Sequence, residues 1–146
     1  ERSGEIVFNR PQSIAIDPAA GELIVADACN HRLGRFSLDG ELIAWIGGPG
    51  VELFSYPYGI ALLEDRRVVV TEFGGNRVSL VELDSGSIVR RFGAPGREAG
   101  ELASPWGIAV RGEEAFVLDS GNNRIQVFDA PGRPIDPYTR PGGAGG

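Results

Sequence analysis

The sequence predicts an all-β fold built from three four-stranded antiparallel sheets. The first observation is a threefold repeat: a proline and an Ile-Ala pair, an apolar run ending in an acidic residue, then Asn and Arg, and a second apolar run. The copies begin at Pro11, Pro57 and Pro105. The second observation is that short β-branched runs alternate with Gly, Pro and Asp turn signals about every 8 to 12 residues. No segment has helical periodicity.

In the first copy, turn residues bound each predicted strand. Ile14 and Ile16 alternate with Ala15 before a turn at Asp17-Pro18-Ala19-Ala20-Gly21, and an Asp-Gly pair at 39–40 separates the last two runs. The predicted strands are residues 13–17, 22–27, 32–37 and 42–46.

The second and third copies repeat this order with shorter first turns. In the third copy, Pro131, Pro134 and Pro137 deplete the backbone of donors after the third run, so a fourth strand there is at best an edge strand. The predicted strands are 59–63, 67–72, 77–83 and 87–92 in copy two, and 107–111, 114–119, 124–129 and 133–138 in copy three.

Each predicted sheet is apolar on both faces, because Ile14 and Ile16 point to one side and Ala15 and Ile24 to the other. One such sheet is not stable alone and needs a neighbour on each face. The repeat spacing, 46 and 48 residues between prolines, is typical of propellers and solenoids. Four-stranded sheets stacked around an axis form a β-propeller.

The repeat motif resembles the NHL repeat. Copy one carries Asn30-His31-Arg32-Leu33, and copy three carries Asn122-Asn123-Arg124-Ile125 within a longer matching run. Copy two departs from the pattern, with Glu72 in place of Asp and no His before Arg77. The resemblance covers residues 8 to 133 and implies an NHL-type β-propeller segment of three blades, half of a six-bladed propeller.

The repeats define the expected domain organisation. We expect blade 3 to have a degenerate fourth strand, and the chain to begin within an inter-blade linker. The divisions are a linker at 1–10, blade 1 at 11–56, blade 2 at 57–104, blade 3 at 105–138 and a Gly/Pro tail at 139–146.

Three blades do not close a propeller, since propellers use about four to eight. Three arrangements remain open at this point. A homodimer would supply six blades, a longer native chain would supply further blades, or a different subunit would cover the open sheets.

Composition limits the classes of partner. The 146 residues carry a net charge of −6 with no Lys, which disfavours nucleic acid, and no apolar run is long enough to insert in a membrane. Cys29 is the only cysteine, so no internal disulfide forms. The sequence has no Met, which indicates processing or truncation. The use of Arg alone, together with many Gly, Ala and Pro, suggests a GC-rich bacterial source, and we expect a periplasmic or extracellular location.

An acidic residue, an Asn and an Arg recur after the second strand of every copy. Residues identical in all repeats serve what all repeats share, so we interpret them as caps and ion pairs of the turn. The alternative is a ring of carboxylates that holds Ca²⁺. The residues are Asp27, Asn30, Arg32, Glu72, Asn76, Arg77, Asp119, Asn123 and Arg124.

No catalytic residue, metal ligand or cofactor is predicted. The zinc lyase chemistry that some NHL propellers support needs several His ligands, and His31 is the only histidine. His31 and Cys29 are therefore interpreted as turn residues.

Positions that differ between copies are better candidates for recognition. The resemblance to propellers places the loops entering the first strands and those joining strands two and three on one face. Aromatic residues there can anchor a ligand or plug the space between adjacent blades, and both interpretations stay open. The candidate binding residues are Gln12, Tyr58, Trp106, His31, Phe73 and Asn122.

The opposite end carries mixed charge, including Glu22, Arg66 and Arg111, which we interpret as solvating the turns. The predicted function is a non-catalytic protein-interaction or scaffold module, an accessory subunit or part of a larger propeller, whose partner is a protein or a second copy. The alternatives are a calcium-assisted hydrolase or lyase or small-ligand binder, and RNA binding, which the acidic charge disfavours.

Overall fold

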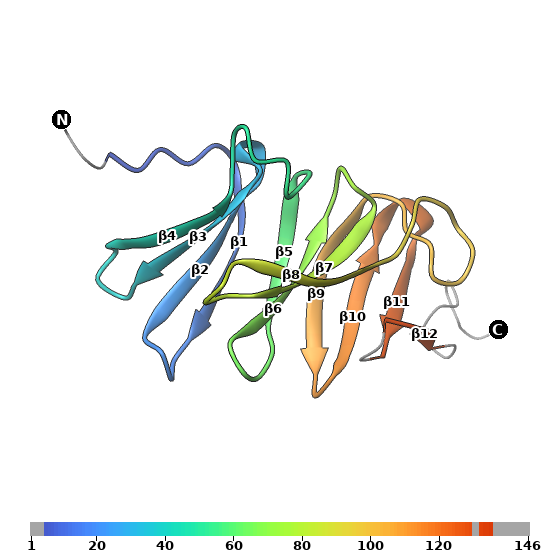
Figure 1. Cartoon of the computed structure of the whole chain (residues 1–146). Coiled ribbons are helices and arrows are strands. Elements are labelled where there is room, and N and C mark those ends of the chain that lie inside the picture. Colours follow the sequence, from blue (N-terminus) through green and yellow to red (C-terminus); the bar gives the residue numbers. More distant parts are fainter. Residues whose placement is uncertain (1–4, 130–131, 136–146) are drawn as a thin grey trace.

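A computed structural model describes residues 5–129 and 132–135 of the chain. The described residues form three twisted antiparallel sheets that stand side by side (Figure 1). Each sheet is a meander in which consecutive strands pair. The predicted all-β architecture of three four-stranded sheets is confirmed.

Blade 1 and blade 2 have complete sheets with a similar layout. The turn after the second strand of blade 1 is a short 3₁₀ helix, η1 (Ala28–Asn30). The strands of blade 1 are β1 (Pro11–Asp17), β2 (Glu22–Asp27), β3 (Arg32–Ser37) and β4 (Leu42–Gly47), and those of blade 2 are β5 (Pro57–Leu62), β6 (Arg67–Glu72), β7 (Arg77–Glu82) and β8 (Ser87–Phe92).

The structure describes two residues of the fourth strand of blade 3. Val127 pairs with Ile135 and Phe128 with Pro134, and the rest of the range predicted for this strand, residues 136–138, lies outside the described residues, as does the predicted tail at 139–146. The elements of blade 3 are β9 (Pro105–Arg111), β10 (Glu114–Asp119), η2 (Ser120–Asn122), β11 (Arg124–Phe128) and β12 (Pro134–Ile135).

The first strand of every blade begins two residues earlier than predicted, at the proline itself. Pro11 lies opposite Asp27, and an irregular register between Pro11 and Ser13 absorbs the extra residue. Proline is tolerated here because the first residue of an edge strand does not need to donate a ladder hydrogen bond.

The core consists of two apolar layers, one between each pair of adjacent blades. Ile24, Ala26 and Leu33 of blade 1 pack with Ile60 and Val68 of blade 2. The other face of blade 2 packs on blade 3 through a second cluster of Val69, Val78, Leu80, Leu102, Val117 and Phe128. Both faces of blade 2, which are apolar in the sequence, are thus buried, one in each layer.

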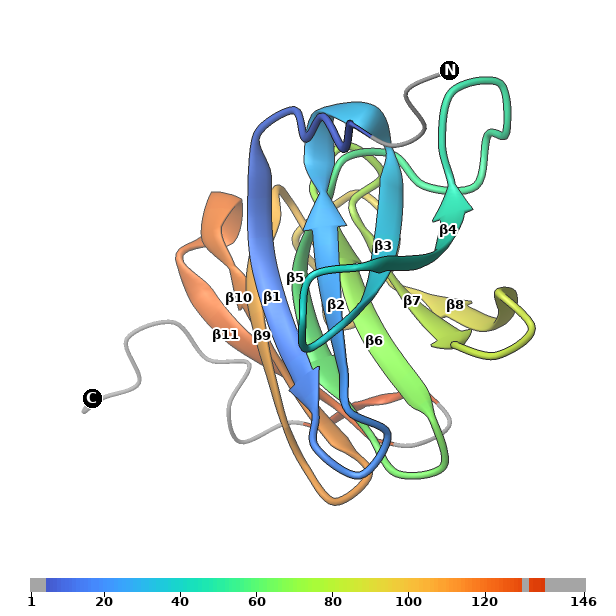
Figure 2. The same cartoon turned by 90° about the vertical axis from the view of Figure 1, so that its left-hand side faces the viewer.

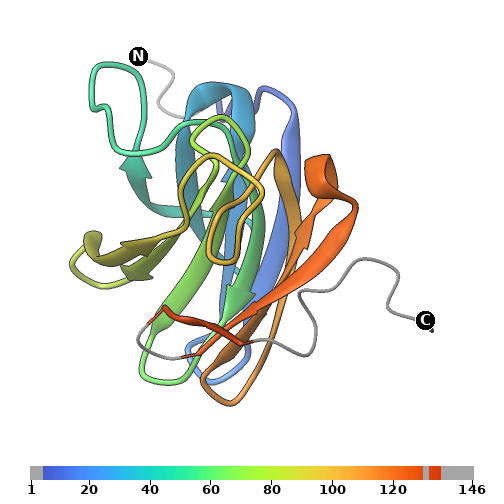
Figure 3. The same ribbon diagram turned by 90° about the vertical axis from the view of Figure 1, so that its right-hand side faces the viewer.

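Within residues 5–129 and 132–135, the two outermost blades each leave one face without a neighbouring sheet. Figure 2 shows blade 1 from its uncovered side, with β1 and β2 in front, and Figure 3 shows the opposite end, where blade 3 faces the viewer. Among the described residues, no helix is long and apolar enough to cross a membrane.

Candidate functional site

One end of the sheets carries the repeated motif. This end, here called the upper rim, contains the segments that enter β1, β5 and β9 and the turns after β2, β6 and β10 (top of Figure 1). The other end, the lower rim, contains the turns after β1, β5 and β9.

A buried carboxylate organises the upper rim of blade 1. Asp27 is fully buried, and its Oδ1 accepts the backbone N–H of Asn9 at 2.7 Å. Its Oδ2 accepts from Arg32 Nε at 2.8 Å and Asn30 Nδ2 at 2.9 Å. The acid therefore ties the incoming segment, the turn and β3 together, and both of its oxygens are occupied.

Blade 3 repeats this unit at the same positions. Asp119 is fully buried, accepts the Ala103 N–H at 2.7 Å, and binds Arg124 Nε at 2.7 Å and Asn122 Nδ2 at 2.9 Å. Asn122 is thus the counterpart of Asn30. Asn76 and Asn123, which the sequence analysis had aligned with Asn30, instead take the place of His31.

Blade 2 has a variant of the unit, because Glu72 is one methylene longer than Asp. Its Oε1 accepts the Ser55 N–H at 2.8 Å and Arg77 Nη2 at 2.9 Å, and its Oε2 accepts the hydroxyl of Ser79. Arg77 therefore binds through Nη2, and its Nε is buried without a hydrogen-bond partner among the described residues. Burial and the nearby Arg77 charge lower the pKa of Arg91, which lies beside this unit.

A second set of equivalent residues links successive blades. His31, Asn76 and Asn123 all have left-handed backbones, with φ of 52°, 51° and 53°. His31 Nδ1 accepts the backbone N–H of Tyr56 at 3.1 Å, and Asn76 Oδ1 accepts that of Ser104 at 2.8 Å. Each bond joins the turn of one blade to the residue before the first proline of the next.

Three aromatic side chains gather on the upper rim where blades 2 and 3 meet. Tyr58 stacks on Phe73 with ring centroids 4.5 Å apart, and Trp106 meets both edge-on at 5.0 and 5.7 Å. Trp106 remains 48% exposed. This aromatic cluster both fills the space between the blades and presents a ring to solvent.

Two hydrogen bonds of the buried Thr71 hydroxyl hold the backbone beneath the aromatic cluster in place. The Thr71 hydroxyl accepts the Gly59 N–H at 2.8 Å and donates to the Trp106 carbonyl at 2.5 Å. A Cβ at Gly59 would lie 2.5 Å from that carbonyl, so only glycine permits this approach of β5 to β9. The backbones that carry Tyr58 and Trp106 are therefore fixed relative to each other.

The other predicted binding residues lie apart from the aromatic cluster. His31 packs edge-on against Tyr56 at 4.4 Å, and the Asn122 amide is bound to Asp119 and to the Gly96 carbonyl. Gln12 is exposed on the uncovered side of blade 1, and Cys29 is a partly buried free thiol in η1. The structure thus brings together three of the six predicted residues.

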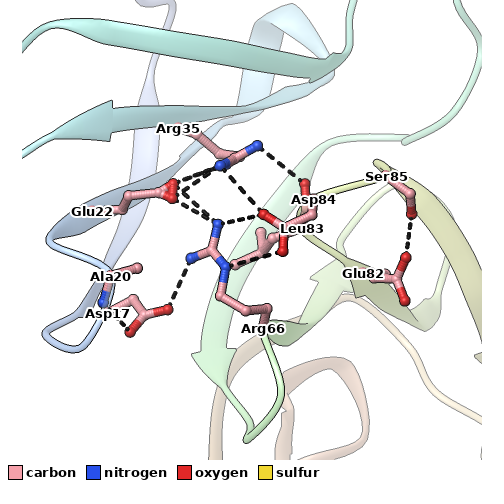
Figure 4. A network of polar contacts seen from close by, with 9 residues as sticks. All are labelled: Asp17, Ala20, Glu22, Arg35, Arg66, Glu82, Leu83, Asp84 and Ser85. Carbon is pink, nitrogen blue, oxygen red and sulfur yellow. Dashed lines mark hydrogen bonds and ion pairs between the residues drawn. The ribbon is translucent and has the colours of Figure 1, made fainter.

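The lower rim holds an ion-pair network that the sequence analysis missed. Glu22 is only 5% exposed, and its carboxylate accepts hydrogen bonds from Arg35 Nη2 and Arg66 Nη2, each at 2.7 Å (Figure 4). Arg66 also binds Asp17 and Asp84, both at 2.9 Å. The hydrogen bond to Arg66 is the main cause of the lowered pKa of Asp17 and of Asp84.

This network joins blades 1 and 2, since Arg66 lies in the turn after β5 while Asp17 and Glu22 flank the turn after β1. The expectation that Glu22 and Arg66 only solvate turns was wrong. The signal in the sequence was the acid pair Asp17 and Glu22 at the ends of two paired strands, opposite two arginines.

Comparison with known proteins identifies the repeat. The model of the NHL repeat matches residues 8–36 and 102–128, which are the segments that contain the Asp-Asn-Arg units of blades 1 and 3. Blades 1 and 3 therefore carry NHL repeats. Blade 2, with its Glu72 variant, lies between the two matched segments.

Curated relatives of this NHL chain are much longer proteins. It is 27% identical over 135 residues to the protein brain tumor of Drosophila melanogaster and 26% identical over 148 residues to peptidyl-glycine alpha-amidating monooxygenase A of Xenopus laevis. The matches cover 90% and 86% of this chain but 12% and 16% of those proteins. A segment of 43 residues is 51% identical to lin-41 of Caenorhabditis elegans.

Solved structures show the same fold at low sequence identity. A chain of the nidogen/laminin complex matches with a TM-score of 0.71 and 17% identity, covering 88% of the NHL chain and 47% of its own length. Hydrazine synthase of Kuenenia stuttgartiensis matches at 0.69 and 19%, covering 92% and 38%, and virginiamycin B lyase of Staphylococcus aureus at 0.65 and 22%, covering 88% and 42%. Three blades therefore span less than half of each solved chain.

Proposed function

We propose that this NHL chain is a non-catalytic interaction module that binds an apolar segment of a partner protein through the aromatic cluster. The observation that carries the proposal is the half-exposed Trp106 ring, which Tyr58 and Phe73 support from the side. Aromatic side chains held rigid before binding lose little entropy on contact and dominate many protein interfaces. A scaffold or accessory-subunit role is part of the same proposal.

The fold alone does not choose between binding and catalysis. Among proteins that share it, one structure is the complex of nidogen with laminin, whereas hydrazine synthase and virginiamycin B lyase are enzymes by name. The choice must rest on the residues of this chain.

The calcium-assisted alternative is disfavoured by the state of the carboxylates. Both oxygens of Asp27 and of Asp119 already accept hydrogen bonds from backbone and Arg groups, and both residues are fully buried. Among the described residues, no cluster of three or more His, Cys, Asp or Glu side chains could hold a metal ion. Calcium should therefore leave the melting temperature unchanged, and stabilisation by calcium that EDTA reverses would favour the alternative.

Peptide display on the immobilised chain tests the binding proposal directly. Random peptides enriched on the wild type should carry apolar anchors, and their Kd should rise at least about tenfold for Phe73→Ala and Trp106→Ala, equivalent to about 1.4 kcal/mol. Leu38→Ala is the matched control, since Leu38 is an exposed apolar residue in the turn between β3 and β4. Equal binding to all variants, or no enriched peptide, would exclude this site. The mass of each variant must equal that of the wild type, so that a change in assembly is not mistaken for a change in binding.

A further inference from the structure

Both outer faces of the molecule expose apolar side chains. On blade 1, Ile14 and Ile16 are 59% and 56% exposed, and on blade 3, Leu118 and Ile125 are 48% and 44% exposed. An open apolar pocket lies on each face. Contiguous apolar surface of this kind marks a site of association.

The same positions are buried wherever a neighbouring blade is present. The blade 2 counterpart of Ile14 is Ile60, which faces blade 1 and is 7% exposed. The blade 1 counterparts of Leu118 and Ile125 are Ala26 and Leu33, which face blade 2 and are fully buried. The first proline of each blade shows the same dependence on a preceding blade: Pro57 and Pro105 are buried, whereas Pro11 is exposed.

Blade 1 and blade 3 also carry the donor and the acceptor of a third inter-blade hydrogen bond, which is not formed within the described part of one chain. At the two internal junctions, His31 accepts the N–H of Tyr56 and Asn76 accepts the N–H of Ser104. The third acceptor is Asn123 and the third donor is the N–H of Arg10, which has the same left-handed φ, 54°, as Tyr56 (52°) and Ser104 (50°). In the described part of the chain, neither the Asn123 amide nor the Arg10 N–H has a partner.

We propose that a second copy of this chain covers both faces, so that blade 3 of each copy packs on blade 1 of the other and the pair forms a closed ring of six blades. In this arrangement Asn123 accepts the N–H of the partner's Arg10, and Ile14 packs with the partner's Leu118 and Ile125. The contact continues the two blade junctions that the chain already contains.

A second copy fits better than an unrelated partner, because the chain supplies both halves of the junction. Two such contacts related by a twofold axis close the ring and leave neither apolar face exposed. Six blades lie within the range of closed propellers. The solved chains that share the fold are also about twice as long as this one, since the match covers 38–47% of them.

The mass of the purified chain in solution tests the proposal. Light scattering after size exclusion should give a particle of twice the 15.5 kDa chain mass. Ile14→Glu and Leu118→Glu should each give monomers with the circular dichroism of the wild type, because both side chains are already exposed within one chain. Val89→Glu is the matched control: Val89 is 55% exposed on β8, away from both faces, and its change should leave the pair intact.

Asn123→Gly isolates the hydrogen bond, because glycine keeps the left-handed backbone and removes only the amide. Because the pair contains two such bonds, the dimer of this variant should dissociate about 30-fold more readily than that of the wild type. A wild-type mass of 15.5 kDa, an open-ended assembly that grows with concentration, or dimers that survive both Glu substitutions would each overturn the proposal. None of these outcomes bears on peptide binding, so the two proposals fail separately.

Discussion

At the scale of the residue, the left-handed turn position shows how one backbone geometry accepts different side chains. His31 and Asn76 share φ near 52° and both accept the N–H of the residue that precedes the next proline. Asn and His are among the residues that tolerate this region, whereas a β-branched residue is strained there. The only histidine of the chain thus has a structural task that Asn also performs.

Replacing His31 should separate this task from any chemistry of the imidazole. His31→Asn should change the free energy of unfolding by less than about 0.5 kcal/mol. His31→Val should lose about 2 kcal/mol, because it strains the backbone and leaves the Tyr56 N–H unpaired. Urea unfolding measures both values, and a large loss in His31→Asn would show that the ring itself is required.

Removing a motif carboxylate should be far more damaging. Asp27→Ala leaves the half-buried Arg32 and the Asn9 N–H without their acceptor, and we expect a loss of about 3 kcal/mol in the free energy of unfolding. Glu41→Ala, on an exposed turn, is the control and should stay within about 0.5 kcal/mol. Equal losses in the two variants would mean that the unit does not stabilise the blade.

At the scale of the element, the lower-rim network connects two turns that are distant in sequence. Arg66 has three carboxylates within hydrogen-bond distance, while Glu22 also keeps Arg35. Charge-assisted bonds to a buried carboxylate are stronger than exposed ion pairs. The junction of blades 1 and 2 is therefore sensitive to acid at this end.

The pH dependence of stability follows from the lowered pKa of Asp17 and Asp84. A carboxylate whose pKa is lower in the folded than in the unfolded state stabilises the fold above its ordinary value of 3.8. That contribution is lost as the pH falls through the lower, folded pKa. The free energy of unfolding should thus decrease below about pH 4.

Arg66→Gln should remove about 2 kcal/mol at pH 7 and flatten the dependence below pH 4, because the cation that lowers both pKa values is gone. Arg111→Gln is the matched control, since Arg111 is an exposed arginine that forms an ion pair with Glu114 and lies over the Phe116 ring, away from the lower-rim network. Unfolding by urea at a series of pH values measures the effect, and parallel curves for wild type and Arg66→Gln would contradict it.

At the scale of the whole molecule, closure by a second copy couples folding to association. A species that binds only the folded state raises its stability by mass action. The melting temperature of the wild type should therefore rise with protein concentration, and that of Leu118→Glu should not. Calorimetry over a wide concentration range checks this, and a constant wild-type value would show that the chain melts as a monomer.

Local patterns predicted the strands because each copy repeats the same apolar runs and turn residues. The strand starts at Pro11, Pro57 and Pro105 were missed, because proline is disfavoured in strands. It is accommodated here by an edge position and an irregular register beside it. The alignment of Asn30 with Asn76 and Asn123 failed by one residue, because the left-handed backbone, not the type of side chain, defines the equivalent position. The ion-pair network could not be predicted, because Glu22 and Arg66 meet only after two blades have packed.

A closed ring of two copies would present two aromatic clusters to one partner. All three first strands enter from the upper rim, so both aromatic clusters of a twofold pair lie on the same side of the ring. A partner with two copies of the bound segment could engage both, and the second contact would form at the high effective concentration of a tethered site. Avidity of this kind typically strengthens binding 100- to about 10,000-fold without any new contact. Two weak sites on one rim would then act as a single tight one.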